Sequence, residues 1–215
     1  KINKNMKNKI LIIILIISII IIATVNGFYF IKQNKPSINS IENTSFPSKA
    51  DGDNQIDSAQ PQNKLVTDDF EITLPVGWQK TEPTIGSSAM AVKIDEQLSD
   101  PAAQKINFRS YFAVVYDTMQ GESLEEYIQT TKDQLQQTIS NIIFSQEHDT
   151  TINSQAARAF EADFNQKGID FKILMVAIKG INDDVWIISF NTLQSTWTDY
   201  KDSFSDIANS FSLKK

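Results

Sequence analysis

Acid–base and nucleophilic catalysis usually require a histidine, or paired carboxylates held in a cleft. The chain contains one histidine, His148, which lies between Glu147 and Asp149. These three residues could form a weak metal site, but consecutive side chains of a strand point to opposite faces. No G-x-S-x-G motif, which places a serine nucleophile on a strained turn, occurs in the chain. We therefore interpret His148 as a surface residue and predict neither an enzyme nor a bound cofactor.

Three groups of acidic residues could bind a cation. Asp51, Asp53 and Asp57 stand in a stretch similar to a calcium loop, which spaces its oxygen ligands two residues apart. Ile56 occupies the place of the turn glycine in that loop, so we interpret the stretch as linker and keep calcium as an open alternative. The other two groups are the pairs Asp68-Asp69 and Asp183-Asp184. Both pairs lie at expected turns, where Asp commonly bonds to the local backbone.

Aromatic residues could line an apolar ligand pocket. The candidates are Trp78, Trp186, Trp197, Tyr111 and Tyr116. Packing between a sheet and its helices would use the same residues, and we interpret them as core. A pocket between sheet and helix for a small ligand or lipid remains the alternative.

The longest apolar segment is residues 10–31, which contains 22 residues without a charged side chain. A helix of that length is about 33 Å long, enough for a hydrocarbon core of about 30 Å. The residues expected to contact lipid include Ile10, Ile14, Ile17, Ile21, Val25, Phe28 and Phe30. We predict one transmembrane helix that anchors the chain in a lipid bilayer.

Charge before this segment predicts its orientation. Residues 1–9 contain four lysines, and no acid occurs before Glu42. The positive-inside rule then places residues 1–9 in the cytoplasm and the C-terminal domain outside it, in a single-pass membrane protein. The alternative is a secretory signal cleaved near Gly27, which would release the domain.

Composition limits the classes of binding partner and indicates the kind of genome that encodes the chain. The five lysines up to Lys32 leave 15 basic residues against 26 acidic ones in the rest of the chain, a charge of −11. Such an acidic exterior argues against nucleic acid as a partner. There is no Cys, which excludes disulfides and a lipoprotein anchor. Abundant Lys, Ile and Asn are typical of an AT-rich bacterial genome.

Residues 32–64 are expected to be a flexible linker. Pro36, Pro47 and Pro61 lie there among Asn, Ser, Gln and Asp. The segment has too few apolar residues to offset its ordering entropy. As a coil it would span roughly 30 Å.

Residues 65–215 are expected to form one α+β domain. The pattern of apolar residues predicts strands at 70–74, 89–94, 108–116, 156–165, 171–178 and 185–192, of which 108–116 and 171–178 are apolar on both faces. The last three have short connections and therefore form an antiparallel meander. The stretch between Phe144 and Asn153 is polar, and 95–107 is expected to be a loop or short helix.

Two amphipathic helices complete the predicted domain. Ser123 with Glu126, and Thr196 with Asp199, have the spacing of N-terminal capping signals. Several strands are apolar on both faces, so both faces need cover. We predict an antiparallel sheet with one helix on each side, an α/β/α sandwich.

This order of elements resembles the PsbP-like (Mog1/PsbP-fold) domain over residues 65–213. Residues 70–78 are similar to that family's first strand and its "P-x-x-W" motif. Residues 151–157 are similar to the turn before the family's central meander. Residues 200–211 are similar to the family's final helix and its closing "S-F". The matching positions are Phe70, Pro75, Trp78, Ala156 and Phe211.

The resemblance implies a binding role without catalysis. The fold includes an extrinsic photosystem subunit, a small-GTPase partner and many bacterial envelope proteins, most of them accessory modules. The matching positions are core and turn residues, so the resemblance carries over no functional residue. With its predicted anchor and single histidine, this chain is not expected to serve a photosystem. We predict a membrane-anchored extracytoplasmic module that binds a protein or another envelope component.

Overall fold

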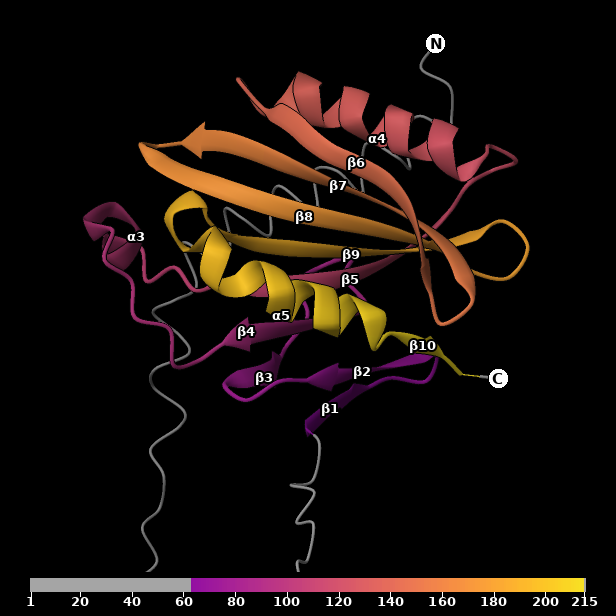
Figure 1. Cartoon of the computed structure of the whole chain (residues 1–215), viewed down its shortest axis with the longest axis horizontal. Helices are drawn as coiled ribbons and strands as arrows, with labels where there is room; N and C mark the ends of the chain where they lie inside the picture. Colours follow the sequence, from indigo (N-terminus) through magenta and orange to yellow (C-terminus); the bar gives the residue numbers. More distant parts are fainter. Residues whose placement is uncertain (1–62, 215) are drawn as a thin grey trace, which may run out of the picture.

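The computed structural model of the protein describes residues 63–214 (Figure 1). The predicted cytoplasmic residues 1–9, the membrane segment 10–31, nearly all of the linker and the candidate calcium ligands therefore lie outside the described residues. Within the described part, no helix combines the length and apolarity needed to cross a bilayer.

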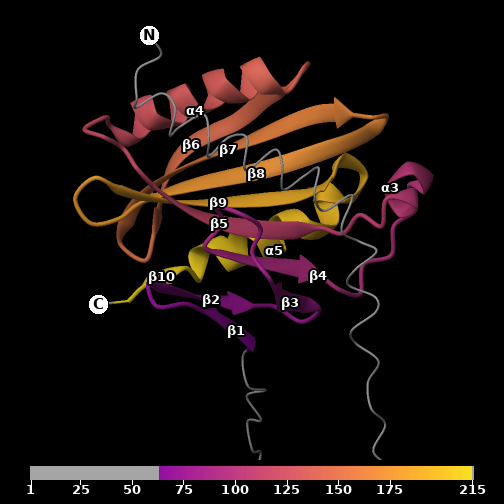
Figure 2. The ribbon, with the colours of Figure 1, turned by 180° about the vertical axis from the view of Figure 1, so that it is seen from behind.

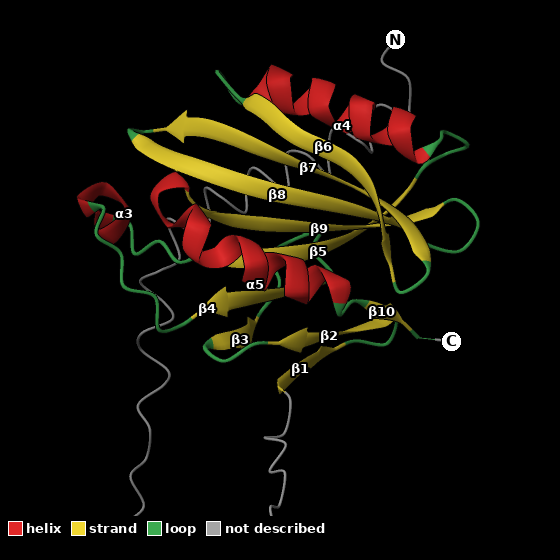
Figure 3. Cartoon of the chain, viewed as in Figure 1, coloured by secondary structure: helices red, strands yellow, loops and turns green. Residues whose placement is uncertain are grey.

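A seven-stranded antiparallel sheet forms the centre of the domain, in the order β3-β4-β5-β9-β8-β7-β6 (Figure 3). Its strands are β3 (Trp78–Thr81), β4 (Ala89–Lys93), β5 (Tyr111–Thr118), β6 (Ile143–Ile152), β7 (Gln155–Gln166), β8 (Ile169–Lys179) and β9 (Asp184–Leu193). The predicted meander of the last three strands is confirmed.

A second, small sheet has the order β1-β2-β10 and brings the two ends of the domain together. Its strands are β1 (Asn63–Val66), β2 (Phe70–Leu74) and β10 (Ser212–Leu213). The sequence pattern predicts β2 but not β1, whose single buried residue is Leu65. Because β1 begins at Asn63, regular structure starts two residues before the predicted boundary at residue 65.

Helices cover both faces of the large sheet. Helix α4 (Leu124–Thr138) lies on one face and α5 (Trp197–Asn209) on the other, as the opposite views of Figure 1 and Figure 2 show. Alternate residues of each central strand accordingly enter two separate apolar clusters. On β9, Val185 and Ile187 face α4, whereas Trp186 and Ile188 face α5. The predicted helix on each side is confirmed.

The short helix α3 (Pro101–Lys105) lies within the stretch expected to be a loop or short helix. Asp100 caps it, because the Asp100 carboxylate accepts hydrogen bonds from the backbone N–H groups of Ala102 and Ala103. Phe108 follows α3 and donates its N–H to the carbonyl of Ala103. The prediction that Phe108 starts a strand is therefore wrong, and Phe108 packs in the core on the α4 side.

The polar stretch before Asn153 is the second difference, because it forms strand β6. This strand lies at the sheet edge, and its one partner strand within residues 63–214 is β7. Most of its side chains are exposed, so the sequence has no apolar alternation there. A bulge between Ser145 and His148, with Gln146 at φ +53°, interrupts the ladder. Such a bulge and its charged neighbours protect an edge from further pairing.

The two predicted helix caps have different outcomes. Ser123 and Glu126 form the predicted capping box at the start of α4. Thr196, in contrast, makes no side-chain cap on α5, which follows the 3₁₀ turn η1 (Gln194–Thr196). The Thr196 hydroxyl instead contacts the Thr192 hydroxyl at 2.8 Å. The tight turn directs this hydroxyl back toward β9.

Candidate functional site

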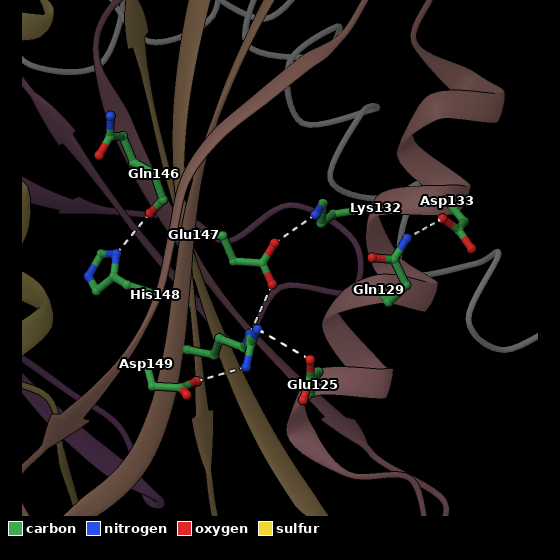
Figure 4. Close-up of polar contacts among 9 residues, drawn as sticks. Glu125, Gln129, Lys132, Asp133, Gln146, Glu147, His148 and Asp149 are labelled. Atoms are coloured by element: carbon green, nitrogen blue, oxygen red, sulfur yellow. Dashed lines mark hydrogen bonds and ion pairs between the residues drawn. The ribbon is translucent and has the colours of Figure 1, made fainter.

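The largest group of charged contacts joins α4 to the sheet edge (Figure 4). Arg158 on β7 lies 2.9 Å from carboxylate oxygens of both Glu147 and Asp149 on β6. Its third partner is Glu125 of α4, at 3.6 Å. Lys132 of α4 also binds Glu147, at 2.7 Å. These five side chains, the α4–β6 ion-pair cluster, connect three elements that are separate in the sequence.

The charges of this cluster satisfy one another. Hydrogen bonding from Lys132 lowers the pKa of the Glu147 carboxyl, partial burial opposes that shift, and hydrogen bonding from Arg158 adds to it. Hydrogen bonding to Glu147 likewise raises the pKa of Arg158. A carboxylate held between two cations is a poor general base, because its ionised form is the favoured one. The cluster is therefore suited to holding α4 on the sheet.

His148 does not join Glu147 and Asp149 in a metal site. The ring Nδ1 of His148 lies 2.8 Å from the carbonyl oxygen of Gln146. Figure 4 shows the imidazole on the other side of β6 from the two carboxylates. No group of His, Asp and Glu side chains among residues 63–214 has the arrangement of a metal site.

The two acid pairs within the described part lie at turns, as predicted. Asp184 accepts a hydrogen bond of 2.7 Å from the Tyr116 hydroxyl. At the other pair, the Thr67 hydroxyl accepts hydrogen bonds from the N–H groups of Asp69 and Phe70, so the threonine makes the local contacts that the sequence assigns to Asp.

The aromatic residues do not form the walls of one pocket. Trp78 packs against Phe112 and Phe204 at ring-centroid distances of 5.8 and 5.9 Å, within the core on the α5 face. Trp186 belongs to the same core. Tyr111 lies on the opposite face of the sheet. These placements support the interpretation of Trp78 and Trp186 as core residues.

The positions that carry the family resemblance lie where the small sheet meets the large one. Phe70 packs between Phe211 and Trp186, at 5.2 and 5.1 Å. The carbonyl of Pro75 accepts a hydrogen bond from the N–H of Trp78, which closes the turn between β2 and β3. Ala156 is the second residue of β7 and pairs with Thr151. These residues build the fold and do not form a reactive site.

Two clusters of buried polar side chains are not predicted by the sequence. Glu96 accepts hydrogen bonds from the N–H and the hydroxyl of Ser110, at 2.5 and 2.7 Å, and the Ser110 hydroxyl also contacts Thr192. Burial, followed by the charge and hydrogen bonding of Glu96, raises the pKa of Tyr200. These residues are far apart in the sequence, and no local motif marks them.

The second group surrounds Lys172 on β8. Its ammonium lies 2.9 Å from carboxylate oxygens of both Glu161 and Asp163, and 5.1 Å from the centre of the Trp197 ring. Lys172 is 9% exposed, so its charge depends on these partners. The alternation of β7 does indicate that Glu161 and Asp163 share a face, but it does not identify the lysine opposite them.

Solved structures share this arrangement of strands and helices. LpqN of Mycobacterium tuberculosis, involved in cell envelope biogenesis, has 12% sequence identity and a TM-score of 0.53, over 74% of this chain and 88% of LpqN. The cyanobacterial PsbP protein CyanoP of Synechocystis sp. PCC 6803 has 12% identity and a TM-score of 0.50, over 76% and 98%. A mutant of Mog1 has 14% identity and a TM-score of 0.50, over 71% and 96%.

The domain has the Mog1/PsbP-like fold. The predicted resemblance is thus confirmed at the level of the fold. No family model and no curated protein match the sequence. At identities of 12–14%, the Mog1/PsbP-like fold is what these structures share, and their activities are not transferred with it.

Proposed function

We propose that the protein is a membrane-anchored accessory module, which presents its Mog1/PsbP-like domain outside the cytoplasm to a protein or another envelope component. The observation that carries this proposal is the uncharged segment 10–31, preceded by four lysines and followed by a polar linker. The involvement of LpqN in cell envelope biogenesis supports the same setting, because the two proteins share a fold.

A binding role without catalysis is part of the proposal. It is supported by the α4–β6 ion-pair cluster. There Arg158 binds the carboxylates of Glu147 and Asp149, and Lys132 binds that of Glu147. Within residues 63–214, the hydrogen-bond partner of the His148 imidazole is a backbone oxygen. Neither arrangement supplies the nucleophile and base that a hydrolytic site requires.

The anchor can be tested by placing charges within the apolar segment. Each lysine at the centre of a membrane helix costs about 2.5–3.5 kcal/mol for insertion. We expect Ile14→Lys combined with Ile17→Lys to move the protein out of the membrane fraction, whereas the matched control Ile14→Leu with Ile17→Leu stays in it. Protease added to intact spheroplasts should digest the domain of the control. A protected domain, or a lysine variant that remains in the membrane, would contradict the proposal.

The accessory role can be tested by cross-linking in intact cells. The full chain is compared with a chimera that keeps residues 1–62 and carries an unrelated acidic domain in place of residues 63–215. We expect a defined envelope component to be cross-linked by the full chain and not by the chimera. Recovery of the same components by both proteins, or of none by the full chain, would argue against a binding module.

A further inference from the structure

The two most exposed large apolar side chains within residues 63–214 flank β3, which is an edge strand of the large sheet. Val76, in the turn before β3, is 85% exposed, and Ile85, in the turn after it, is 88% exposed. Ile94 is 48% exposed and lies beside the first turn, because its N–H donates to the carbonyl of Gly77. Single exposed apolar residues are ordinary, whereas several along one edge indicate a contact surface. Val76, Ile85 and Ile94 together are called the β3 edge.

The fold holds Val76 in its outward position. The N–H of Trp78 donates to the carbonyl of Pro75, and Gly77 has φ +82°, a conformation that suits the third position of a tight turn. The ammonium of Lys93 also donates to the carbonyl oxygen of Val76, at 3.1 Å. The side chain of Trp78 is buried beneath the turn, whereas that of Val76 stays in solvent. The exposure of Val76 is therefore set by the turn itself.

The predicted linker enters the domain at this same edge. Asn63, the first described residue, pairs with Leu74 at the end of β2. The side-chain amide of Asn63 donates to the carbonyl of Trp78 at 2.9 Å, which places Asn63 next to the Val76 turn. Figure 1 and Figure 2 show β1, β2 and β3 together on the side of the domain away from α4. Residues 32–62 alone separate the predicted membrane segment from this edge.

The charges along the β3 edge permit contact with lipid headgroups. Lys80 is the charged residue of β3 and is exposed between the two turns. Beside Ile94, the exposed Arg109 donates to the carbonyl oxygen of Ile94 at 2.7 Å, and Lys93 binds Asp95 at 2.7 Å. Although the chain has a formal charge of −6, cations thus lie between and beside the exposed apolar side chains. Basic residues in such places are attracted to the phosphates of a bilayer surface.

We propose that the β3 edge rests on the surface of the bilayer in which the protein is anchored. Val76 and Ile85 enter the headgroup layer, and Lys80 between them contacts lipid phosphate. This inference rests on the proposed membrane anchor and adds the bilayer surface as a partner of the folded domain. The contact needs little affinity of its own, because a short tether holds the domain near the bilayer at an effective concentration on the order of millimolar.

Docking in this way gives the domain a defined orientation. Strand β6 forms the edge of the large sheet opposite to β3, and α4 covers the neighbouring strands β7 and β8. With the β3 edge on the bilayer, α4 and β6 face away from it. These elements then form the part of the domain that is open to other envelope components.

The test measures how closely β3 approaches lipid in the full chain, reconstituted into phosphatidylcholine vesicles. The chain contains no Cys, so Gln79→Cys provides a single thiol for an environment-sensitive fluorophore on an exposed position of β3. Lipid with a nitroxide on its headgroup quenches a fluorophore that it contacts. We expect this quenching to be about threefold stronger for the label at position 79 than for a label introduced by Ile143→Cys. Ile143 is 66% exposed on β6, at the opposite edge of the sheet.

A pair of substitutions separates docking from attraction of the fluorophore to lipid. In the Gln79→Cys chain, Val76→Ser with Ile85→Ser should reduce nitroxide quenching to the level of the label at position 143. Ile143→Ser with Ile181→Ser is the matched control, because it also replaces two exposed apolar residues without changing the charge, and it should keep the full quenching. All four positions are exposed, and circular dichroism verifies that each variant is folded.

The outcomes distinguish docking from the anchor on which it rests. Co-flotation with the vesicles after a carbonate wash measures the anchor. A chain that carbonate removes would overturn the anchor and docking together. An anchored chain with equal quenching at positions 79 and 143, or with quenching unchanged by the serine pair at 76 and 85, would overturn docking alone. A label at position 79 that is shielded from water but not quenched by nitroxide lipid would assign the edge to a second copy of the chain, which also overturns docking.

Discussion

At the scale of single residues, what matters is which charges the fold pairs and which polar atoms it leaves unpaired. The carboxylates that the sequence places beside His148 are bound by Arg158 and Lys132, while the imidazole lies apart from them. Tyr111 and Asn191, in contrast, are buried with polar atoms to spare. A structural role follows for the first group.

The first prediction concerns the pH dependence of the α4–β6 ion-pair cluster. The pKa of Glu147 is lowered from its ordinary value of 4.5 in the folded state. Its stabilising contribution is therefore fully present above about pH 4.5 and is lost as the pH falls through the folded-state pKa. We expect Glu147→Gln to reduce the free energy of unfolding by about 1 kcal/mol at pH 7 and by much less at pH 3.

Urea denaturation of both proteins at several pH values measures this difference. Glu82→Gln, at an exposed carboxylate, is the matched control and should be neutral throughout. A stability difference for Glu147→Gln that stays constant between pH 3 and pH 7 would contradict the assigned cause.

At the scale of elements, helix caps and turns determine where each segment starts and reverses. The capping box of Ser123 and Glu126 begins α4, directly after the glycine-containing turn that follows β5. The β7–β8 hairpin has two central residues, Lys167 and Gly168, at φ +53° and +81°. Positive φ at both positions is the pattern of a type I′ turn, which matches the twist of the paired strands.

Loss of the α4 cap gives the second prediction. Ser123→Ala removes the hydroxyl that accepts from the N–H of Glu126, and should lower the free energy of unfolding by about 1 kcal/mol. Ser205→Ala is the control, since the hydroxyl of that exposed serine on α5 bonds back to the carbonyl of Lys201 in its own helix. Chemical denaturation should show little change for the control, and equal losses in the two variants would refute the capping role.

The β7–β8 turn gives the third prediction. A Cβ added at Gly168 meets no atom within 4 Å, so Gly168→Ala creates no clash. The substitution should still cost about 1 kcal/mol, because φ is +81°. Lys167→Asn should have the opposite sign, because Asn tolerates this backbone conformation better than Lys. Denaturation midpoints of the two variants on the same side of the unsubstituted protein would contradict the turn assignment.

At the scale of the whole molecule, one sheet separates two cores and makes each depend on the other. Phe160 belongs to the core on the α4 face, whereas Phe190 and Phe204 stack at 4.9 Å in the core on the α5 face. Each central strand contributes side chains to both cores, so neither face can lose its packing without disturbing the strands that the other face uses. The domain should therefore unfold as one cooperative unit.

The fourth prediction tests this cooperativity. Phe160→Ala should lower the free energy of unfolding by about 3–5 kcal/mol. Phe160 lies in the core on the α4 face, whereas Trp78, Trp186 and Trp197 all pack on the α5 face. Tryptophan fluorescence and far-UV circular dichroism should nonetheless report the same lowered midpoint. A fluorescence transition that stays in place while the circular dichroism transition moves would show that the two cores unfold separately.

Apolar periodicity in the sequence determined most of the fold. Apolar residues on both faces of 171–178 and 185–192 predict buried central strands, and the capping signal at Ser123 predicts the start of α4, because these features depend on near neighbours in the chain. The Mog1/PsbP resemblance rests on the same local information. The polar segment that follows residues 10–31 is interpreted as a linker from the sequence alone. The membrane anchor itself stays a prediction.

Only the tertiary structure decided what carries no local signal. Strand β6 is held by backbone pairing at a sheet edge, where polar side chains show no alternation of burial. The partners of Arg158 come from two other elements, α4 and β6, and Tyr111 pairs with Asn191 across a ladder that joins residues 80 positions apart in the chain. Such contacts arise when the chain folds back on itself, so residue spacing does not reveal them.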